Sequence, residues 1–126
     1  RNPVIFVLWD TPTWKPGHIE ISQLARLMVI APCTANFLGK YANGIADDAL
    51  TTSAMAYEGE VLLAPAMNTR MWRNPAVQHN CETLRARGIH FVGPNAGRLA
   101  CGDSGEGRMA EVPEILSAVR ELLPIS

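Results

Sequence analysis

A thiol lies within a glycine-rich segment near the C-terminal end of the sequence. Residues 97–109 include four glycines among thirteen residues, and Cys101 stands between Ala100 and Gly102. A glycine-rich segment of this length inside a compact domain is typical either of a functional loop or of a surface loop with an incidental cysteine. A thiol on a flexible loop can pass a proton to a bound molecule. We therefore predict an acid–base role for Cys101.

Two further peptides share one pattern: a short apolar run, an Ala-Pro pair, and then small or amide residues. Residues 31–36 supply Thr34 and Asn36, and residues 64–68 supply Asn68. Each peptide is predicted to lie where a strand ends and a helix begins. A helix N-terminus favours an anion or an electron-rich ring edge, but the same residue types also serve as ordinary helix caps. Two such loops at one sheet edge favour a small-molecule site, and both interpretations stay open.

Histidine is the side chain that titrates near neutral pH. His18 follows a Pro-Gly turn and precedes a predicted short helix over residues 19–27, which is typical of either an exposed or a functional histidine. His79 and His90 fall within a predicted helix and a predicted strand, so we expect them to be structural. No pair of cysteines or histidines has the spacing of metal ligands, and no metal site is predicted.

These groups need a scaffold that brings them together. Three apolar runs that end at proline or glycine predict strands buried on both faces, over residues 27–31, 61–64 and 89–92. Caps and breakers predict helices from Thr34 to Tyr41, from Asp48 to Tyr57 after a cap at Asp47, from Asn74 to Gly88, and from Glu111 to Leu123. Strands that alternate with helices form a parallel sheet, and ligands bind at the carboxyl ends of its strands.

Composition and charge exclude several classes of protein. The 126 residues are 48% hydrophobic and 18% charged, which fits one globular domain and excludes an extensively disordered chain. A net charge of −1 lacks the basic surplus of a dedicated nucleic-acid binder. No apolar run reaches the roughly 20 residues of a membrane-spanning helix. Cys33, Cys81 and Cys101 form no disulfide framework, which predicts a reducing compartment, the cytoplasm.

Three motifs resemble those of the flavin-dependent cysteine decarboxylases. Residues 65–72, PAMNTRMW, resemble the family's PxMNxxMW motif, and residues 100–109, ACGDSGEGRM, resemble its substrate-recognition clamp. His18 resembles the active-site histidine, ahead of an Ala-Pro-x-Thr-Ala-Asn peptide at residues 31–36 as in the family. The motifs occur in the family's order over almost the whole chain, and the branch that acts in coenzyme A biosynthesis is the most similar.

The resemblance implies an α/β, Rossmann-like (flavodoxin-like) fold with three layers and a parallel sheet. It also implies FMN as cofactor and the decarboxylation of 4'-phosphopantothenoylcysteine to 4'-phosphopantetheine through a thioaldehyde and an enethiolate. Such a route is needed because direct loss of CO2 from a cysteinyl carboxylate would leave a carbanion without an electron sink. Two alternatives share parts of the pattern: a peptidyl-cysteine decarboxylase, and a non-catalytic FMN-binding regulatory relative.

The resemblance further implies a role for each matching residue. Cys101 matches the proton donor of the reduction step, His18 the histidine of the oxidation and decarboxylation steps, and Asn68 the asparagine that holds the substrate carboxylate. Further substrate-binding positions are Met71, Ala100, Gly102, Arg108 and Met109. The flavin is expected to contact Ala31, Pro32, Thr34, Asn36, Ala64, Pro65 and Met67. Cys33 stands where many relatives have alanine or serine, and we interpret it as a packing residue.

The resemblance also bears on domain organisation and assembly. The family begins with a strand and a Gly/Ser-rich turn that contacts the FMN phosphate, and no such unit precedes Val4. We therefore expect residues 1–126 to form one flavoprotein domain that is N-terminally incomplete, without its first βαβ unit. Members of the family assemble as trimers or larger particles. A homotrimer or higher homo-oligomer is expected, with no nucleic-acid or membrane partner.

Overall fold

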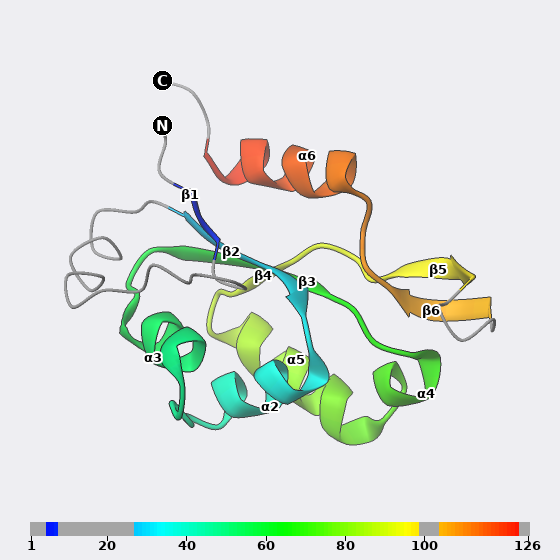
Figure 1. The fold of residues 1–126 in the computed structure, drawn as a ribbon, viewed down its shortest axis with the longest axis horizontal. Helices are drawn as coiled ribbons and strands as arrows, with labels where there is room; N and C mark the ends of the chain where they lie inside the picture. Colours follow the sequence, from blue (N-terminus) through cyan, green and yellow to red (C-terminus); the bar gives the residue numbers. More distant parts are fainter. Residues whose placement is uncertain (1–4, 8–26, 99–103, 124–126) are drawn as a thin grey trace.

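A four-stranded parallel sheet forms the centre of the molecule (Figure 1). The computed structural model describes residues 5–7, 27–98 and 104–123. The strands lie in the order β1 (Ile5–Val7), β2 (Leu27–Cys33), β3 (Glu60–Pro65) and β4 (His90–Phe91). Because all neighbouring pairs are parallel, their carboxyl ends lie at one edge of the sheet.

The central strands are apolar along their length because both faces of the sheet are covered. Along β2, Leu27 and Val29 belong to one core cluster, whereas Met28 and Ile30 belong to the other. This is the alternation expected of a strand, in which successive side chains point to opposite faces. The strand β3 alternates in the same way.

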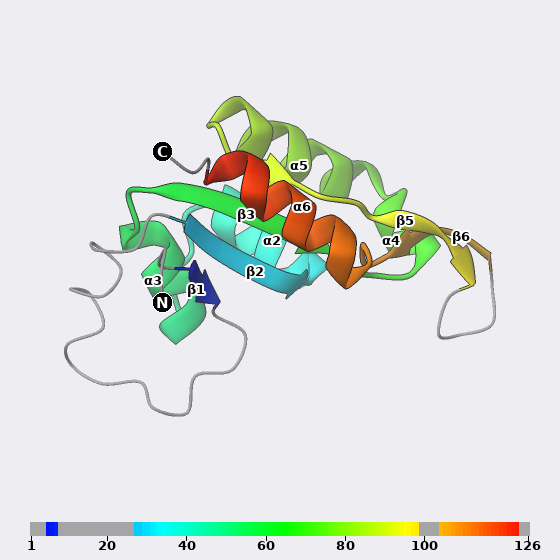
Figure 2. The ribbon, with the colours of Figure 1, turned by 90° about the horizontal axis from the view of Figure 1, so that it is seen from above.

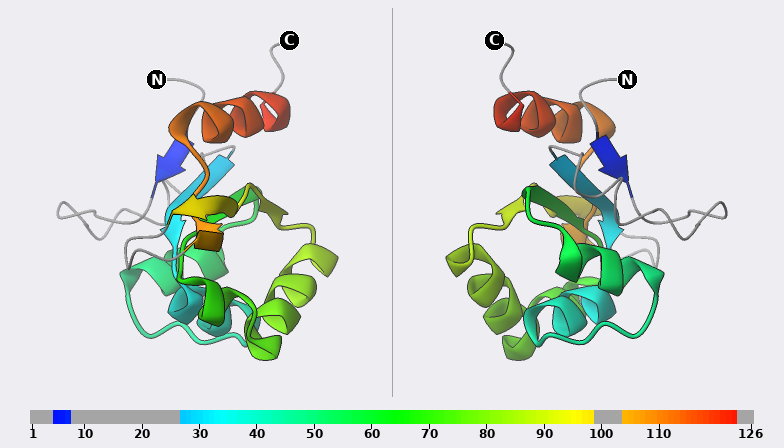
Figure 3. Two further views of the ribbon diagram at one scale, coloured as in Figure 1. Left: turned by 90° about the vertical axis from the view of Figure 1, so that its right-hand side faces the viewer. Right: turned by 90° about the vertical axis from the view of Figure 1, so that its left-hand side faces the viewer.

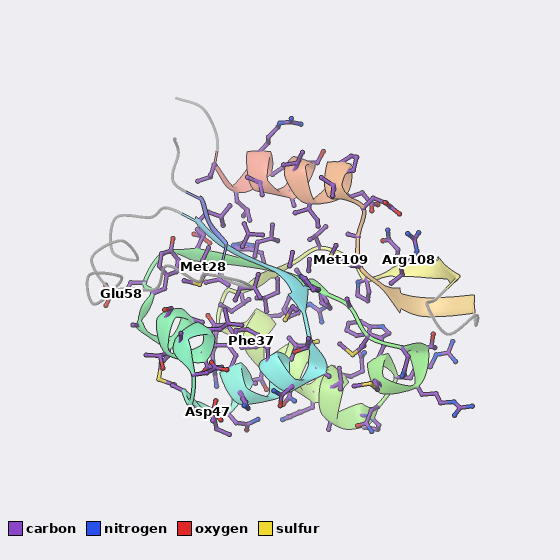
Figure 4. The ribbon with its side chains drawn as sticks, in the orientation of Figure 1. Met28, Phe37, Asp47, Glu58, Arg108 and Met109 are labelled. Atoms are coloured by element: carbon purple, nitrogen blue, oxygen red, sulfur yellow. The ribbon has the colours of Figure 1, made fainter. Side chains whose placement is uncertain are left out.

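Three helices cover one face of the sheet, as Figure 3 shows end-on. They are α2 (Ala35–Ala42), α3 (Ala49–Ala56) and α5 (Pro75–Ala86). Their buried side chains join those of β2 and β3 in a single cluster, in which Met28 and Phe37 lie between the sheet and α2 (Figure 4). The Asn74 cap and Pro75 at the first turn of α5 confirm that helix's predicted start.

The opposite face is covered by α6 (Val112–Leu122), which lies across β2 and β3 in Figure 2. Ile115 and Val119 of α6 pack with Ala110 against Leu62 and other side chains of this face. The predicted three-layer α/β fold with a parallel sheet is therefore confirmed within the described residues.

The segment predicted as a long flexible loop contains two paired strands. The strands β5 (Asn95–Arg98) and β6 (Ser104–Arg108) form an antiparallel pair, in which Gly97 lies opposite Gly105. The prediction of a loop over the described parts of residues 97–109 was therefore wrong. The glycines do not prevent pairing, because the ladder satisfies backbone groups whatever the side chain. We call β5 and β6 together the hairpin.

Three other local expectations need correction. The cap of α3 is Asp48, not Asp47, and Asp47 instead forms an ion pair with Lys40 at 3.0 Å. The strand β2 continues past Pro32 to Cys33 across a bulge, in which Ala31 and Pro32 have no register partner on β3 and pairing resumes between Cys33 and Pro65. A short helix, α4 (Thr69–Trp72), was not predicted. The predicted helix over residues 19–27 lies almost wholly outside the described residues.

Candidate functional site at the carboxyl edge of the sheet

The peptides that follow β2 and β3 lie side by side. Cys33 and Pro65 are register partners at the ends of the two strands. Just beyond them, the Ala66 amide donates to the Cys33 carbonyl at 3.0 Å. The two Ala-Pro peptides therefore form one continuous edge, as their shared pattern predicted.

The first of these peptides opens α2. Thr34 is its N-cap, and its Oγ1 accepts a hydrogen bond from the Phe37 amide at 3.0 Å. Asn36 is exposed in the first helical turn. The capping interpretation of Thr34 is confirmed. The contact of Thr34 with a flavin stays a prediction. The cap does not use the Asn36 side chain, which is exposed.

The second peptide opens α4 with Asn68 as its N-cap. Asn68 Oδ1 accepts a hydrogen bond from the Met71 amide at 2.9 Å. An amide side chain has one acceptor oxygen and one donor NH2 group. Because the cap uses one of the two acceptor sites of the oxygen, the exposed Asn68 side chain offers a ligand chiefly its NH2 donors. The same turn leaves the Met71 side chain 44% exposed beside it.

The hairpin packs directly against the Asn68 peptide. The Met67 amide donates to the Gly107 carbonyl at 2.9 Å. Gly107 is buried with φ +128°, and a Cβ at this position would lie 2.2 Å from the Met67 carbonyl oxygen. Only glycine permits such an approach of two backbones. Gly107 therefore joins the strand that carries the clamp motif to the loop that carries Asn68.

The last residues of the clamp motif lie where the hairpin meets the sheet (Figure 4). Arg108 Nη1 donates to Glu111 Oε2, so an acidic partner already meets part of the guanidinium charge. Met109 is half-buried and packs against the cluster beneath α6. Both residues were predicted to bind substrate. In this structure they join the hairpin to the core, and Arg108 keeps further N–H donors.

The residues predicted to contact the flavin form an uncharged edge. Ala64 and Pro65 are buried and support this edge from within. Ala31 and Met67 are half-buried, and Pro32 is exposed. Small apolar groups beside the Asn36 and Asn68 amides suit a planar ring that has a polar rim. The residues present at this edge therefore fit the ring portion of FMN.

Two cysteines lie within the core. Cys33 and Cys81 are fully buried free thiols in the cluster beneath α2 and α5. Burial raises the pKa of both thiols, because a thiolate is poorly solvated there. The interpretation of Cys33 as a packing residue is confirmed, since a buried and protonated thiol is a poor acid–base group at neutral pH.

Several predicted site residues fall in parts of the chain that the structure does not describe. His18, Ala100, Cys101 and Gly102 lie outside the described residues. Their roles therefore stay predictions. Among the residues that are described, no three His, Cys, Asp or Glu side chains gather as a metal-binding group. None of the described helices is long and apolar enough to cross a membrane.

Sequence reasoning missed the groups that hold the hairpin in place. Asn95 Nδ2 donates to Glu114 Oε1 at 2.7 Å, and the Glu111 amide donates to the same oxygen at 2.7 Å. These hydrogen bonds lower the pKa of Glu114, the Asn95 contact contributing most, with the nearby Arg108 charge as a smaller cause. A glutamate three residues after the start of a predicted helix signals a capping box, but nothing local indicates the partner on β5.

The parallel sheet lies between two helical layers, and the carboxyl ends of its strands form an edge that suits a ligand. These features define an α/β protein of the flavodoxin-like class. The family model described as Flavoprotein matches residues 4–124. The chain belongs to the Flavoprotein family.

Curated relatives carry decarboxylase and coenzyme A biosynthesis names. The chain is 44% identical over 105 residues to the coenzyme A biosynthesis bifunctional protein CoaBC of Haemophilus influenzae, covering 83% of this chain and 26% of that protein. It is 49% identical over 115 residues to phosphopantothenoylcysteine decarboxylase of Oryza sativa subsp. japonica, covering 86% of this chain and 52% of that protein. The chain thus spans about a quarter and about half of these relatives.

Solved structures agree with the fold. A PPC decarboxylase mutant complexed with pantothenoylaminoethenethiol has a TM-score of 0.83 at 40% identity, covering 93% of this chain and 65% of that one. The FMN binding protein AtHal3 has a TM-score of 0.76 at 43% identity, covering 90% of this chain and 62% of that one. At these identities, the similarity extends beyond the fold to the sequence.

Proposed function

We propose that this chain acts in the FMN-dependent decarboxylation of 4'-phosphopantothenoylcysteine to 4'-phosphopantetheine. The observation that carries the proposal is the contact between Met67 and Gly107, which joins the Asn68 peptide to the strand of the clamp motif. The relatives named as phosphopantothenoylcysteine decarboxylase and CoaBC support the same reaction.

The carboxyl edge of the sheet suits the isoalloxazine ring of FMN. Ala31, Pro32 and Met67 would lie against the ring, Ala64 and Pro65 would support them, and Thr34 and Asn36 would meet its polar atoms. When bound, FMN supplies the two-electron oxidation of the substrate that makes loss of CO2 possible and the later return of the hydride. The FMN-binding relative AtHal3 supports this choice of cofactor.

The protein's own residues bind, orient and exchange protons. The NH2 group of Asn68 donates to the substrate carboxylate and adds no charge, because the amide is neutral, while its Oδ1 holds the helix cap. Met71 offers an exposed apolar surface beside it. His18 acts as a base or orients the carboxylate before CO2 leaves, and Cys101 donates the proton when the enethiolate is reduced.

A direct test uses the protein reconstituted with FMN. It is incubated with 4'-phosphopantothenoylcysteine or with a peptide that ends in cysteine, and CO2 release is followed for each. We expect release from the first substrate. Release from the peptide alone would make the chain a peptidyl-cysteine decarboxylase, and release from neither, with FMN bound, would make it a non-catalytic flavin-binding relative.

The setting of the reaction is part of the proposal. We place it in the cytoplasm, where the free thiols of Cys33 and Cys81 stay reduced. We also expect a homotrimer or a higher homo-oligomer, which size-exclusion chromatography with light scattering would detect. A monomeric mass for the active, FMN-loaded protein would contradict that expectation.

A further inference from the structure

The base of the hairpin is tied to the first turn of α6 by two side-chain contacts. Asn95 and Arg108 are register partners at the open end of the hairpin. Asn95 Nδ2 donates to Glu114 Oε1 at 2.7 Å, and Arg108 Nη1 donates to Glu111 Oε2. Each strand of the hairpin therefore contributes one side chain, and each contacts one glutamate of the same helical turn.

The two glutamates are fixed to each other as well. The Glu111 amide donates to Glu114 Oε1 at 2.7 Å, within a capping box at the start of α6. Glu114 Oε1 thus accepts one hydrogen bond from its own helix and one from the hairpin. Because α6 packs on the sheet through buried Ile115 and Val119, the glutamates have a fixed support. We call Asn95, Arg108, Glu111 and Glu114 the clasp.

Beside the clasp, the backbone at Gly93 packs closely against Ala110. Gly93 has φ +73°, and a Cβ there would lie 3.1 Å from the Ala110 Cβ. On the other side, the hairpin reaches the Asn68 peptide through the bond between the Met67 amide and the Gly107 carbonyl. Gly107 directly precedes Arg108, so the direction in which β5 and β6 leave the sheet depends on two neighbouring contacts at the base of the hairpin, the clasp and the approach of Gly107 to Met67.

We propose that the clasp positions the hairpin against the Asn68 peptide for the decarboxylation reaction. This inference rests on the proposed function. The residues of the clasp are positioning residues that need not touch the substrate. They act through β5 and β6, the strands that precede and follow Cys101 in the chain. Weakening the clasp moves the hairpin relative to Asn68, while the sheet and the edge that suits the flavin stay in place.

The test compares four variants with the wild type, all loaded with FMN. Asn95→Ala and Glu114→Ala remove the hydrogen bond between Asn95 and Glu114, one of the two contacts of the clasp. Glu114→Gln keeps an acceptor oxygen at the same place and is the conservative rescue. Glu121→Ala removes an exposed glutamate from the last turn of the same helix and is the matched control.

Amide hydrogen exchange is the first readout, because it does not depend on activity. We expect exchange in residues 95–98 and 104–108 to rise roughly three- to tenfold in Asn95→Ala and Glu114→Ala, the effect of one lost hydrogen bond. Glu114→Gln and Glu121→Ala should resemble the wild type. Unchanged exchange in both alanine variants, or an equal rise in Glu114→Gln, would overturn the clasp.

The ratio of enethiol to final thiol product is the second readout. Misplacement of the hairpin should raise this ratio in the alanine variants, whereas a general loss of folded protein would lower both products together. A loosened hairpin with an unchanged ratio would overturn the positioning role. If the wild type releases no CO2, the proposed function fails, and the exchange measurement still decides whether the clasp holds the hairpin.

Discussion

Replacing Gly107 by alanine tests whether the close approach of β6 to the Asn68 peptide is needed. The added Cβ would lie 2.2 Å from the Met67 carbonyl oxygen, and 3.2 Å from the carbonyl carbon of Asn68. Carbon atoms attract neighbouring atoms at about 3.5–4 Å, so the two backbones must separate by about 1 Å or more. The φ of +128° is itself strained for alanine. Either the contact breaks or the strand shifts.

The magnitudes decide which event follows. Alanine held in such a backbone conformation costs about 1–3 kcal/mol before the overlap with Met67 is counted. The hydrogen bond from the Met67 amide contributes only about 0.5–1.5 kcal/mol. The strain therefore exceeds what holds this contact together, and we expect β6 to leave the Asn68 peptide. The sheet does not need to unfold, because neither β5 nor β6 belongs to it.

Two measurements follow from this comparison. The thermal midpoint should fall by only about 2–8 °C, which is the effect of roughly 1 kcal/mol in a domain of this size. The rate of CO2 release should fall at least tenfold. A cost of about 1.4 kcal/mol for packing β6 against the Asn68 peptide already lowers the population of the packed state tenfold.

Gly88→Ala is the matched control. Gly88 also has a positive φ, +92°, but nothing lies within 4 Å of the added Cβ. This variant should lower the thermal midpoint by a similar amount and leave CO2 release unchanged. Wild-type activity in Gly107→Ala would refute the reasoning, and so would an equal loss of activity in Gly88→Ala.

Four further outcomes are expected. Cys101→Ser should still release CO2 but accumulate the enethiol, and normal formation of the thiol product in product analysis would count against its role as proton donor. His18→Asn should block CO2 release, so release at the wild-type rate would remove it from the early steps. Asn68→Asp keeps the capping oxygen but sets a negative charge against the substrate carboxylate, so the thermal midpoint should hold while CO2 release falls at least tenfold; unchanged kinetics would refute carboxylate binding. The pKa of Asp48 is lowered from 3.8, chiefly by the backbone and side-chain hydrogen bonds of Thr51. The ionised Asp48 carboxylate therefore stabilises the folded protein above pH 3.8, and this stabilisation is lost as the pH falls through the lowered pKa. The midpoint difference between wild type and Asp48→Ala should therefore shrink below pH 3.8, and a pH-independent difference would contradict the assignment.

Local signals predicted most of the scaffold. Apolar runs located β2 and β3, and the caps Thr34 and Asn74 located the starts of α2 and α5. These features could be predicted from the sequence because each depends on residues within a few positions of one another. The choice between Asp47 and Asp48 as cap was not, since both carboxylates suit the place and a contact with Lys40 engages Asp47.

The candidate site divides in the same way. Asn68 and the glycines of residues 97–109 drew attention by residue type and spacing, and the family motifs gave them a chemical meaning. Their sequence did not indicate that β5 and β6 pair, because the glycine-rich pattern is also that of a loop. Nor did it indicate which part of the Asn68 amide is offered to a ligand, which depends on the hydrogen bond that caps the start of α4.

The sequence by itself determined the elements, their caps and the chemical groups at the ends of the strands. Only the tertiary structure decided that Gly107 meets Met67 and that Asn95 meets Glu114. The physical reason is that propensity and capping act over one helical turn, whereas these contacts join residues that are distant in the chain. They depend on how the sheet, the hairpin and α6 pack against one another, so no local pattern contains them.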